Sequence, residues 1–312
     1  MHFGEENNTG YVRPEYVAVV NAALAAKKAR PFLSDTNTLY RGMRTNCRDH
    51  LKIAYEHGFT PEVTGAPVII PDDTKKENLA CLQIDQRFIK QAKVAKVFLD
   101  ADVILGIAHF KGHMMTGFGA ALKNIGMGCA SRKGKLEQHS DVSPIVYSDK
   151  CVGCGQCIEV CPAEAITLKK DQALINNSKC IGCASCLAAC PEKAIDVDWE
   201  AGSAMIQEKM IEYTYAVLRD RLDRAVFLNF AIKITQECDC LAGDDPRIAP
   251  DIGILASRDP VSLDQACYDL AKKASGKDIF KQVHPKRNAN RQLAYAAGLG
   301  LGQLDYKLIK VS

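Results

Sequence analysis

The sequence predicts a layered α/β domain interrupted by a small, cysteine-rich α+β module. Two observations lead to this prediction. Apolar runs alternate with segments of helical periodicity on both sides of a central cysteine-rich stretch, which is typical of an α/β domain. The central stretch itself contains a repeated cysteine pattern with a different composition. We therefore expect the first part of the α/β domain at residues 1–147, the module at 148–199 and the second part at 200–312.

The first part of the domain alternates helices and buried strands. Helical periodicity predicts helices at Glu15–Arg30 and Arg48–His57. Apolar runs predict a short strand at Pro31–Leu33 and buried strands at Ala66–Ile70 and Val103–Ile107.

The second part continues the same alternation. Ser203–Arg219 has helical periodicity, and Ala225–Phe230 and Ile252–Ala256 are strand-like. Asp259-Pro260 then provides an N-terminal signal for a helix at Val261–Ala274, because aspartate caps helices and proline fits their first turn.

Composition and charge exclude several classes of protein. An apolar fraction of 47% and a charged fraction of 25% are those of a folded globular chain. The net charge of +3 provides no electrostatic footprint for nucleic acid, so none is expected as a partner. The longest apolar stretch, Val97–Phe110, is interrupted by Asp100 and Asp102 and is too short to span a membrane. The N-terminus lacks the basic and apolar regions of a signal peptide, so we expect a cytoplasmic chain with reduced cysteines.

The module contains a four-cysteine run twice, each time followed by proline. The first copy is Cys151-Val-Gly-Cys154-Gly-Gln-Cys157-Ile-Glu-Val-Cys161-Pro, and the second is Cys180-Ile-Gly-Cys183-Ala-Ser-Cys186-Leu-Ala-Ala-Cys190-Pro. Thiolates in this spacing bind [4Fe–4S] clusters, with the fourth cysteine of each run bound to the other cluster. The ligands expected for one cluster are Cys151, Cys154, Cys157 and Cys190, and those for the second are Cys180, Cys183, Cys186 and Cys161.

Zinc is the competing interpretation, since paired cysteines are also zinc-finger ligands. Zinc requires only four ligands and explains neither the third cysteine of each run nor the proline that follows the fourth. We therefore favour two [4Fe–4S] clusters. The segment resembles bacterial two-cluster ferredoxins, and this resemblance implies the exchange of single electrons.

A glycine-rich segment, His109–Gly128, follows the strand that is expected to end near Ile107. The pattern of strand, glycine-rich loop and helix allows backbone N–H groups at the helix start to bind an anion, with Lys123 adding a positive charge. The alternative is that the glycines only make turns and that the histidines lie on the surface. We favour a site because His113, His139 and Lys123 all fall in or close to this segment.

Two further places are candidates for binding. Cys238-Asp239-Cys240 is a pair of soft ligands that an extended segment would present on one face, and we favour an exposed metal or redox site there over core cysteines. Arg41 and Arg44 follow the strand near Leu33, where an α/β sheet commonly binds ligands, and Arg41 is the candidate for positioning a substrate carboxylate or phosphate. A solvated loop is the alternative for the arginines.

The whole chain resembles the DUF362 family of uncharacterised iron–sulfur proteins. The resemblance rests on the segment from His109 to His139, on Asp251-Ile-Gly-Ile-Leu-Ala-Ser-Arg-Asp-Pro-Val and on the Cys238–Cys240 triplet. It implies a segment ahead of His2-Phe3-Gly4-Glu5 that this chain lacks, so we expect the chain to be short at its N-terminus.

A more distant similarity is to the nickel-pincer lactate racemase superfamily. His113, Lys123 and His139 have the separations of that superfamily's histidine, cofactor-tethering lysine and second histidine. The similarity implies that the histidines act as metal ligands or proton donors and that the lysine stabilises an anion or tethers an additional metal or nucleotide-type cofactor.

Together these observations predict an iron–sulfur oxidoreductase or electron-transfer protein. Single electrons would pass from a soluble ferredoxin- or flavodoxin-type carrier, or from a redox enzyme complex, through two [4Fe–4S] clusters to a site in the α/β domain. A small anionic substrate and a homodimer are also expected. Two alternatives remain open: a pure electron carrier that docks a larger redox complex, and a racemase-like isomerase in which the clusters are structural.

Overall fold

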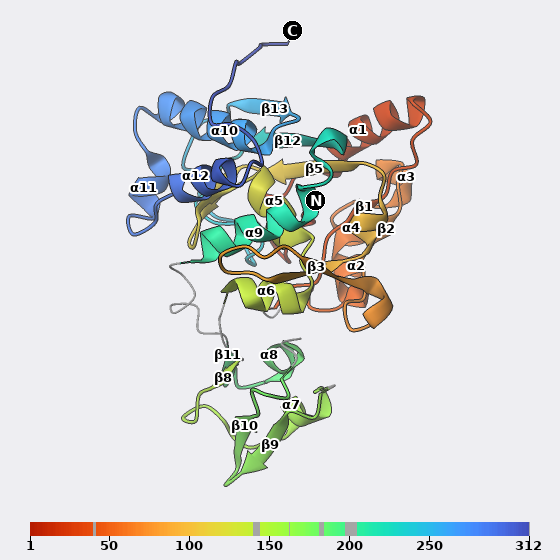
Figure 1. Ribbon diagram of the computed structural model, residues 1–312, viewed down its shortest axis with the longest axis vertical. Coiled ribbons are helices and arrows are strands. Elements are labelled where there is room, and N and C mark those ends of the chain that lie inside the picture. The colour runs from red at the N-terminus through yellow and green to blue at the C-terminus, as the bar shows by residue number, and fades with distance from the viewer. Residues whose placement is uncertain (40–41, 140–143, 162, 181–183, 197–204, 312) are drawn as a thin grey trace.

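The computed structural model of the chain describes residues 1–311 except 40–41, 140–143, 162, 181–183 and 197–204. Figure 1 shows a larger body, built from the sequence on both sides of the cysteine-rich stretch, and a smaller module below it. The chain is therefore an α/β domain with an insertion, as the alternation of apolar runs predicts.

The helices and strands of the larger body come from both parts of the sequence. Its α-helices are α1 Pro14–Ala26, α2 Cys47–Glu56, α3 Pro61–Thr64, α4 Val97–Asp100, α5 Ala121–Gly128, α6 Arg132–His139, α9 Ile206–Leu218, α10 Pro260–Ser275, α11 Ile279–Val283 and α12 Asn290–Gly298, and η1 Lys76–Asn78 and η2 Leu222–Arg224 are 3₁₀ turns. Its strands are β1 Leu33–Ser34, β2 Val68–Ile69, β3 Leu79–Gln83, β4 Gln91–Ala95, β5 Ile104–His109, β6 Lys111–His113, β7 Gly117–Gly119, β12 Ala225–Ala231 and β13 Gly253–Ser257.

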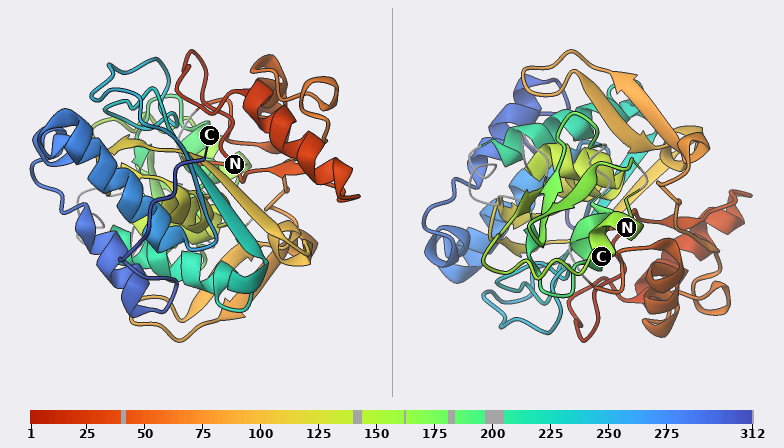
Figure 2. Two further views of the ribbon diagram at one scale, coloured as in Figure 1. Left: turned by 90° about the horizontal axis from the view of Figure 1, so that it is seen from above. Right: turned by 90° about the horizontal axis from the view of Figure 1, so that it is seen from below.

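The central sheet has the strand order β13-β12-β5. Strands β12 and β5 are parallel, with Phe227 opposite Gly106, and β13 is antiparallel to β12. Gly106 is required at this register because a Cβ there would lie 2.8 Å from the Phe227 ring. Figure 2 shows α10 and α1 on opposite sides of these strands, so both faces of the sheet are covered.

The two faces of the sheet belong to different hydrophobic clusters. The larger cluster contains Ile104 and Phe227 and extends into α5, α9, α10 and α12. The other contains Ile107 and Phe230 and packs against the N-terminal segments, including Phe3. The strands β5 and β12 are thus held between two packed layers.

Most of the expected elements are present. Helices α1, α2, α9 and α10 and strands β1, β2, β5, β12 and β13 overlap the segments predicted for them, and Ser203 lies outside the described residues. Asn46 caps α2 by accepting from the Asp49 N–H, and Asp259 caps α10 by accepting from Val261 and Ser262.

The glycine-rich segment differs from the prediction of a loop. Strands β6 and β7 form an antiparallel hairpin in which Lys111 pairs with Gly119, and α5 follows at once. The prediction failed because the pairing involves only short strands containing glycines, which have low strand propensity. The hairpin fixes the position of His113 more rigidly than a loop would.

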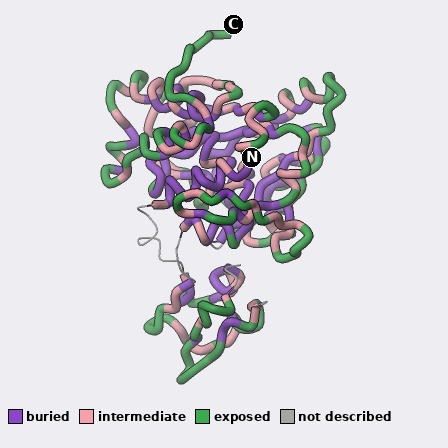
Figure 3. Tube along the Cα trace, viewed as in Figure 1, coloured by how far each residue is buried: buried purple, intermediate pink, exposed green. Residues whose placement is uncertain are grey.

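The module contains β8 Ile145–Val146, α7 Gln156–Glu159, β9 Ile166–Lys169, β10 Gln172–Ile175, α8 Ser185–Ala189 and β11 Ile195–Asp196. Strands β9 and β10 form a hairpin, and β8 pairs with β11 across the insertion. Figure 3 shows that buried residues are concentrated in the larger body and are sparse in the module. Such a small core requires a covalent or metal cross-link for stability.

No helix among the described residues is long and apolar enough to cross a membrane.

Candidate functional site

A cavity of about 510 Å³ opens in the α/β domain, and its wall comes from segments far apart in the sequence. Hairpin β6–β7, helices α5 and α6, the segment after β12 and the N-terminal residues all contribute. The polar and sulfur-bearing side chains that line it include His2, Asp35, Arg44, Lys111, His113, Lys123, Lys135, His139, Cys238 and Cys240. Its chemistry is thus mainly that of cations, histidines and thiols.

Three of the four predicted catalytic residues lie together in this cavity: His113, Lys123 and His139. Burial, reinforced by Lys123 and Lys111, lowers the pKa of His113 well below its usual value. Burial, reinforced by Lys123 and Lys135, lowers the pKa of His139 to about 3. Both histidines are therefore neutral near pH 7. The fourth predicted residue, Arg41, lies outside the described residues.

Cys238 and Cys240 lie beside Lys123. The Lys123 Nζ is 3.6 Å from the Cys238 Sγ. The hydrogen bond that Cys240 donates to Cys238 lowers the pKa of Cys238 well below its usual value; Lys123 acts in the same direction, and burial opposes both. The same hydrogen bond raises the pKa of Cys240. Of the two cysteines, Cys238 is thus the one whose thiolate form the surroundings favour, because the Lys123 ammonium lies beside its sulfur.

The expectation that these cysteines are exposed and extended is wrong. Cys238 is only 2% exposed and Cys240 is half-buried. Leu241 N–H donates to the Cys238 carbonyl oxygen at 3.0 Å, so Cys238 to Leu241 form a hydrogen-bonded turn. The polar sequence around Asp239 suggested exposure because its buried partners are distant in sequence.

Asp239 anchors this turn through its buried carboxylate. Its carboxylate is 2.8 Å from Lys111 Nζ, 3.3 Å from His2 Nδ1 and 3.6 Å from His109 Nδ1, and it is 1% exposed. Burial alone would lower the pKa of Lys111, but Asp239 and Cys238 outweigh it and raise that pKa. The ion pair between Lys111 and Asp239 is thus charged and buried.

Arg44 fixes the turn from the other end. Its guanidinium donates to the Glu5 carboxylate at 3.1 Å and to the Cys240 carbonyl oxygen at 3.1 Å, and it lies 2.7 Å from the His2 ring. Arg44 is 1% exposed and also lines the cavity, so the arginine that we considered as a ligand-binding group supports the turn as well.

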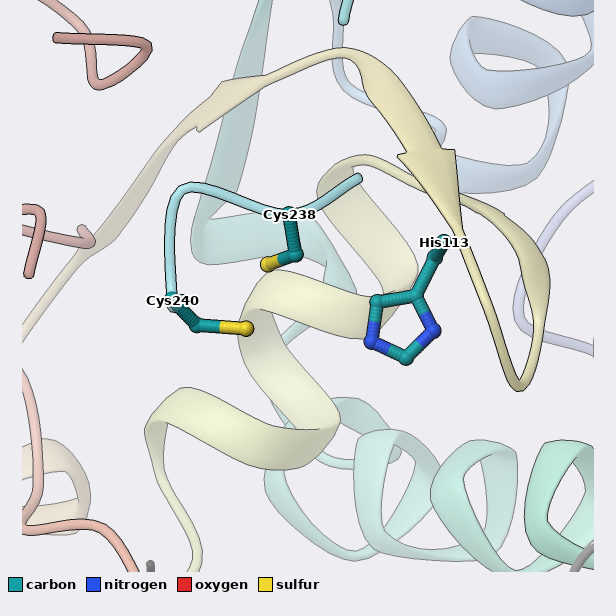
Figure 4. Close-up of side chains that lie close together, drawn as sticks. All are labelled: His113, Cys238 and Cys240. Carbon is teal, nitrogen blue, oxygen red and sulfur yellow. The ribbon is translucent and has the colours of Figure 1, made fainter. Parts of the chain in front are cut away.

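His113 faces the two sulfur atoms. Among the described residues, His113, Cys238 and Cys240 bring one ring nitrogen and two sulfurs within 4.8 Å of one another. Figure 4 shows one ring nitrogen directed toward the sulfurs and the other turned away. The Nδ1 accepts from the N–H groups of Met115 and Thr116, each at 3.2 Å. The proton of the neutral ring therefore resides on Nε2, which faces the sulfurs.

The first two N–H groups of helix α5, which we expected to face an anion, have an acceptor within the protein. The N–H groups of Ala121 and Leu122 donate to the two carboxylate oxygens of Asp264, each at 3.0 Å. Asn229 donates to the same carboxylate at 2.7 Å. An internal side chain from α10 thus occupies the position where we expected an anion.

Four module cysteines line a second, smaller cavity: Cys151, Cys154, Cys157 and Cys190. These are the four expected ligands of one cluster, and Cys190 comes from the second repeat. Backbone N–H groups donate to the sulfurs of Cys151, Cys161 and Cys190 from Ala173, Ala165 and Ala194, at 3.2–3.4 Å. Cluster thiolates commonly accept such bonds, so the donor set fits a [4Fe–4S] cluster. Cys183 lies outside the described residues.

The module contacts the domain beside the large cavity. One hydrophobic cluster joins Leu39 and Leu136 of the domain to Cys186, Leu187 and Cys190 of the module. Leu39 also lines the large cavity. The two candidate sites are therefore linked by a continuous packed contact.

Sequence reasoning overlooked Lys135, a charged residue of the cavity wall. Lys135 is buried and donates to the Thr36 and Asn37 carbonyl oxygens at 3.0 and 2.7 Å, and burial lowers its pKa to about 8. Asp35 lies nearby, and Lys135 is the strongest influence that lowers its pKa against the effect of burial. The only signal available was that Lys135 lies one helical turn before His139.

Comparison with known proteins gives a family match over most of the chain and two short matches. A family described as a domain of unknown function, DUF362, matches residues 1–269. Ferredoxin-2 of Desulfomicrobium norvegicum is 53% identical over 32 residues, 10% of this chain and 54% of the ferredoxin. An uncharacterised polyferredoxin-like protein of Methanocaldococcus jannaschii is 59% identical over 27 residues, 9% of this chain and 17% of that protein. The matches span little more than half of one relative and less than a fifth of the other.

Two solved structures are distantly similar. The lactate racemase apoprotein from Thermoanaerobacterium thermosaccharolyticum has a TM-score of 0.37 and 15% identity, over 73% of this chain and 43% of that one. A Thermotoga maritima protein has a TM-score of 0.31 and 12% identity, over 85% of this chain and 60% of that one.

Proposed function

The chain belongs to the DUF362 family, and from that premise we propose that it is an iron–sulfur oxidoreductase that delivers single electrons to the cavity of its α/β domain. The observation that carries the proposal is the cavity lined by four cysteines from both repeats. Bound [4Fe–4S] clusters supply one-electron chemistry. The similarity to a ferredoxin and to a polyferredoxin-like protein supports the same assignment.

The residues of the module hold the two clusters. One cluster would be bound by Cys151, Cys154, Cys157 and Cys190, and the other by Cys180, Cys183, Cys186 and Cys161. Gly153 and Gly155 have φ of +69° and +80°, so glycine permits the tight backbone path between the cysteines. The N–H groups of Ala173 and Ala194 stabilise negative charge on their sulfur partners.

The cavity residues provide the destination. Lys123 and Lys135 supply positive charge for a small anionic substrate, and His113 presents an N–H group to whatever lies against the two cysteines. A soluble ferredoxin- or flavodoxin-type carrier would supply electrons to the exposed end of the module. The pure-carrier alternative leaves this assembly of histidines, lysines and thiols without a role.

The test compares Cys154→Ala with Cys190→Ala under anaerobic conditions. We expect roughly eight iron and eight sulfide in the parent. Each variant should lose the same half of them, because both cysteines belong to one cluster although they lie in different repeats. The double variant should therefore lose no more iron than either single variant, and Cys81→Ser, a change at an exposed cysteine in β3, should lose none.

Two results would contradict the proposal. Absence of iron from the anaerobically purified parent would exclude the clusters. Greater iron loss in the double variant than in each single variant would show that each repeat binds its own metal, as zinc sites would.

A further inference from the structure

The turn at Cys238 holds two sulfurs face to face in the cavity wall. Figure 4 shows both Sγ atoms directed toward the same space, and the two sulfurs lie within 4.8 Å of each other. Both residues line the large cavity, so a small reagent can reach them. We infer that Cys238 and Cys240 are a reversible dithiol–disulfide pair that stores two electrons at this cavity.

Three contacts hold the turn, and with it the two sulfurs, in this arrangement. The Leu241 N–H closes the turn on the Cys238 carbonyl oxygen, Arg44 holds the Cys240 carbonyl oxygen, and Lys111 holds the Asp239 carboxylate. Bond formation between the sulfurs thus requires movement of the side chains, while the turn itself stays anchored.

The charges around the pair stabilise one thiolate. The Arg44 guanidinium is matched by Glu5, and the Lys111 ammonium by Asp239. The Lys123 ammonium faces the Cys238 sulfur at 3.6 Å. A thiolate beside a cation, with a thiol within reach, is the arrangement in which disulfides form and open by exchange.

The hydrogen bonds of His113 are unfavourable for a metal ion bound by His113, Cys238 and Cys240. A histidine that binds a metal normally donates a hydrogen bond through its other nitrogen. The His113 Nδ1 instead accepts from the N–H groups of Met115 and Thr116. The nitrogen that faces the sulfurs therefore bears a proton and serves as a hydrogen-bond donor to sulfur, and a metal would have to displace that proton.

Reduction of the pair consumes two electrons and one proton. The disulfide bond between Cys238 and Cys240 takes up two electrons and breaks, which leaves a thiolate on Cys238 beside Lys123. The Cys240 sulfur takes up one proton from water in the cavity. The reductant is the iron–sulfur module, from which two single electrons are drawn, and in this respect the inference rests on the proposed function. Oxidation reverses these changes and passes two electrons to a substrate in the cavity.

The first experiment measures the pair directly in the cluster-loaded protein. The anaerobic protein is equilibrated with mixtures of reduced and oxidised dithiothreitol, quenched with acid, alkylated and digested with trypsin. The tryptic peptide 234–247 contains Cys238 and Cys240 and no other cysteine, so mass spectrometry separates this pair from the module. We expect a single transition from a doubly alkylated peptide to one that is two hydrogen atoms lighter and unalkylated.

Matched variants distinguish the pair from bystanders. Cys240→Ser should leave Cys238 alkylated once at every mixture, and Cys81→Ser should show the parent transition. Lys123→Met should slow alkylation of Cys238 in the native protein several-fold, since loss of the neighbouring ammonium raises the pKa of the Cys238 thiol and lowers its thiolate fraction. A peptide that stays doubly alkylated at every mixture would overturn the inference. So would a stoichiometric zinc or nickel ion that is lost in both Cys238→Ser and Cys240→Ser.

A second experiment separates this inference from the proposed function. The disulfide form of the cluster-loaded protein is photoreduced with a deazaflavin, and the same peptide is analysed. Opening of the disulfide in the parent, with at least a tenfold slower opening in Cys154→Ala, supports both. A pair that responds to dithiothreitol but stays closed while the clusters are reduced upholds the dithiol and refutes the relay.

Discussion

Replacing Asp239 with asparagine should destabilise the protein more than any nearby surface change. Asp239 is 1% exposed and its carboxylate lies 2.8 Å from the Lys111 ammonium. The substitution keeps the shape of the side chain but removes the carboxylate charge that pairs with the buried Lys111 ammonium, which still donates to the His109 carbonyl oxygen. Breaking a buried pair by removing one partner costs about 3–5 kcal/mol.

A double-mutant cycle measures how much of this loss of stability comes from the interaction between Lys111 and Asp239. Lys111→Met should cost a similar amount because it leaves the Asp239 carboxylate buried beside two histidines. The double variant carries no unpaired charge. Its loss of stability should therefore be smaller than the sum of the single losses by about 2–3 kcal/mol, within the range of coupling energies between contacting residues.

The assay is anaerobic urea unfolding followed by far-ultraviolet circular dichroism, with the slopes of the transitions compared across the four proteins. Glu6→Gln, a change at a neighbouring exposed carboxylate, serves as the control and should shift stability by no more than about 0.5 kcal/mol. Additivity of the two single losses within about 0.5 kcal/mol would refute the reasoning, because it would show that Lys111 and Asp239 do not compensate each other.

Two further predictions concern Asp264, which accepts hydrogen bonds from the start of helix α5, and Gly126 within that helix. Burial raises the pKa of Asp264 to about 7, whereas an unfolded aspartate titrates near 4. Because the folded value is the higher, the stability contributed by this group is fully present below about pH 4 and is lost as the pH rises through about 7. Between about pH 6 and 8 the free energy of unfolding should therefore fall about 1.4 kcal/mol further in the parent than in Asp264→Asn, and equal slopes would contradict the assignment. Gly126→Ala should destabilise the protein by about 1–3 kcal/mol, since its Cβ would lie 2.4 Å from the Met210 carbonyl oxygen. The control is Gly298→Ala, whose Cβ meets nothing within 4 Å and which should be neutral or slightly stabilising. Equal thermal unfolding temperatures for the two variants would show that α5 and α9 can separate.

The sequence was sufficient where chemistry or periodicity acts locally. The cysteine spacing of Cys151 to Cys190 is typical of iron–sulfur ligand runs, so the module is evident from the sequence alone. Apolar periodicity likewise located β5, β12 and α10. His113, Lys123 and His139 were found because all three lie in or beside one short segment.

The remaining features depend on contacts between distant parts of the chain. The Asp264 carboxylate reaches the N–H of Ala121 across a separation of 143 residues. The contact of Lys111 with Asp239, and that of Arg44 with Cys240, likewise join segments that no local pattern connects. Burial of Cys238 follows from these long-range contacts, which is why a polar motif was mistaken for an exposed one.

The pairing of β8 with β11 places the two ends of the module side by side. Val146 lies opposite Ile195, so the two end strands of the module lie at neighbouring positions, about 5 Å apart. A cassette with adjoining ends can be added to a host, or removed from it, without stretching the flanking segments or adding a long open loop. A different electron-carrying unit whose ends are similarly spaced could therefore be exchanged for the module at β8 and β11.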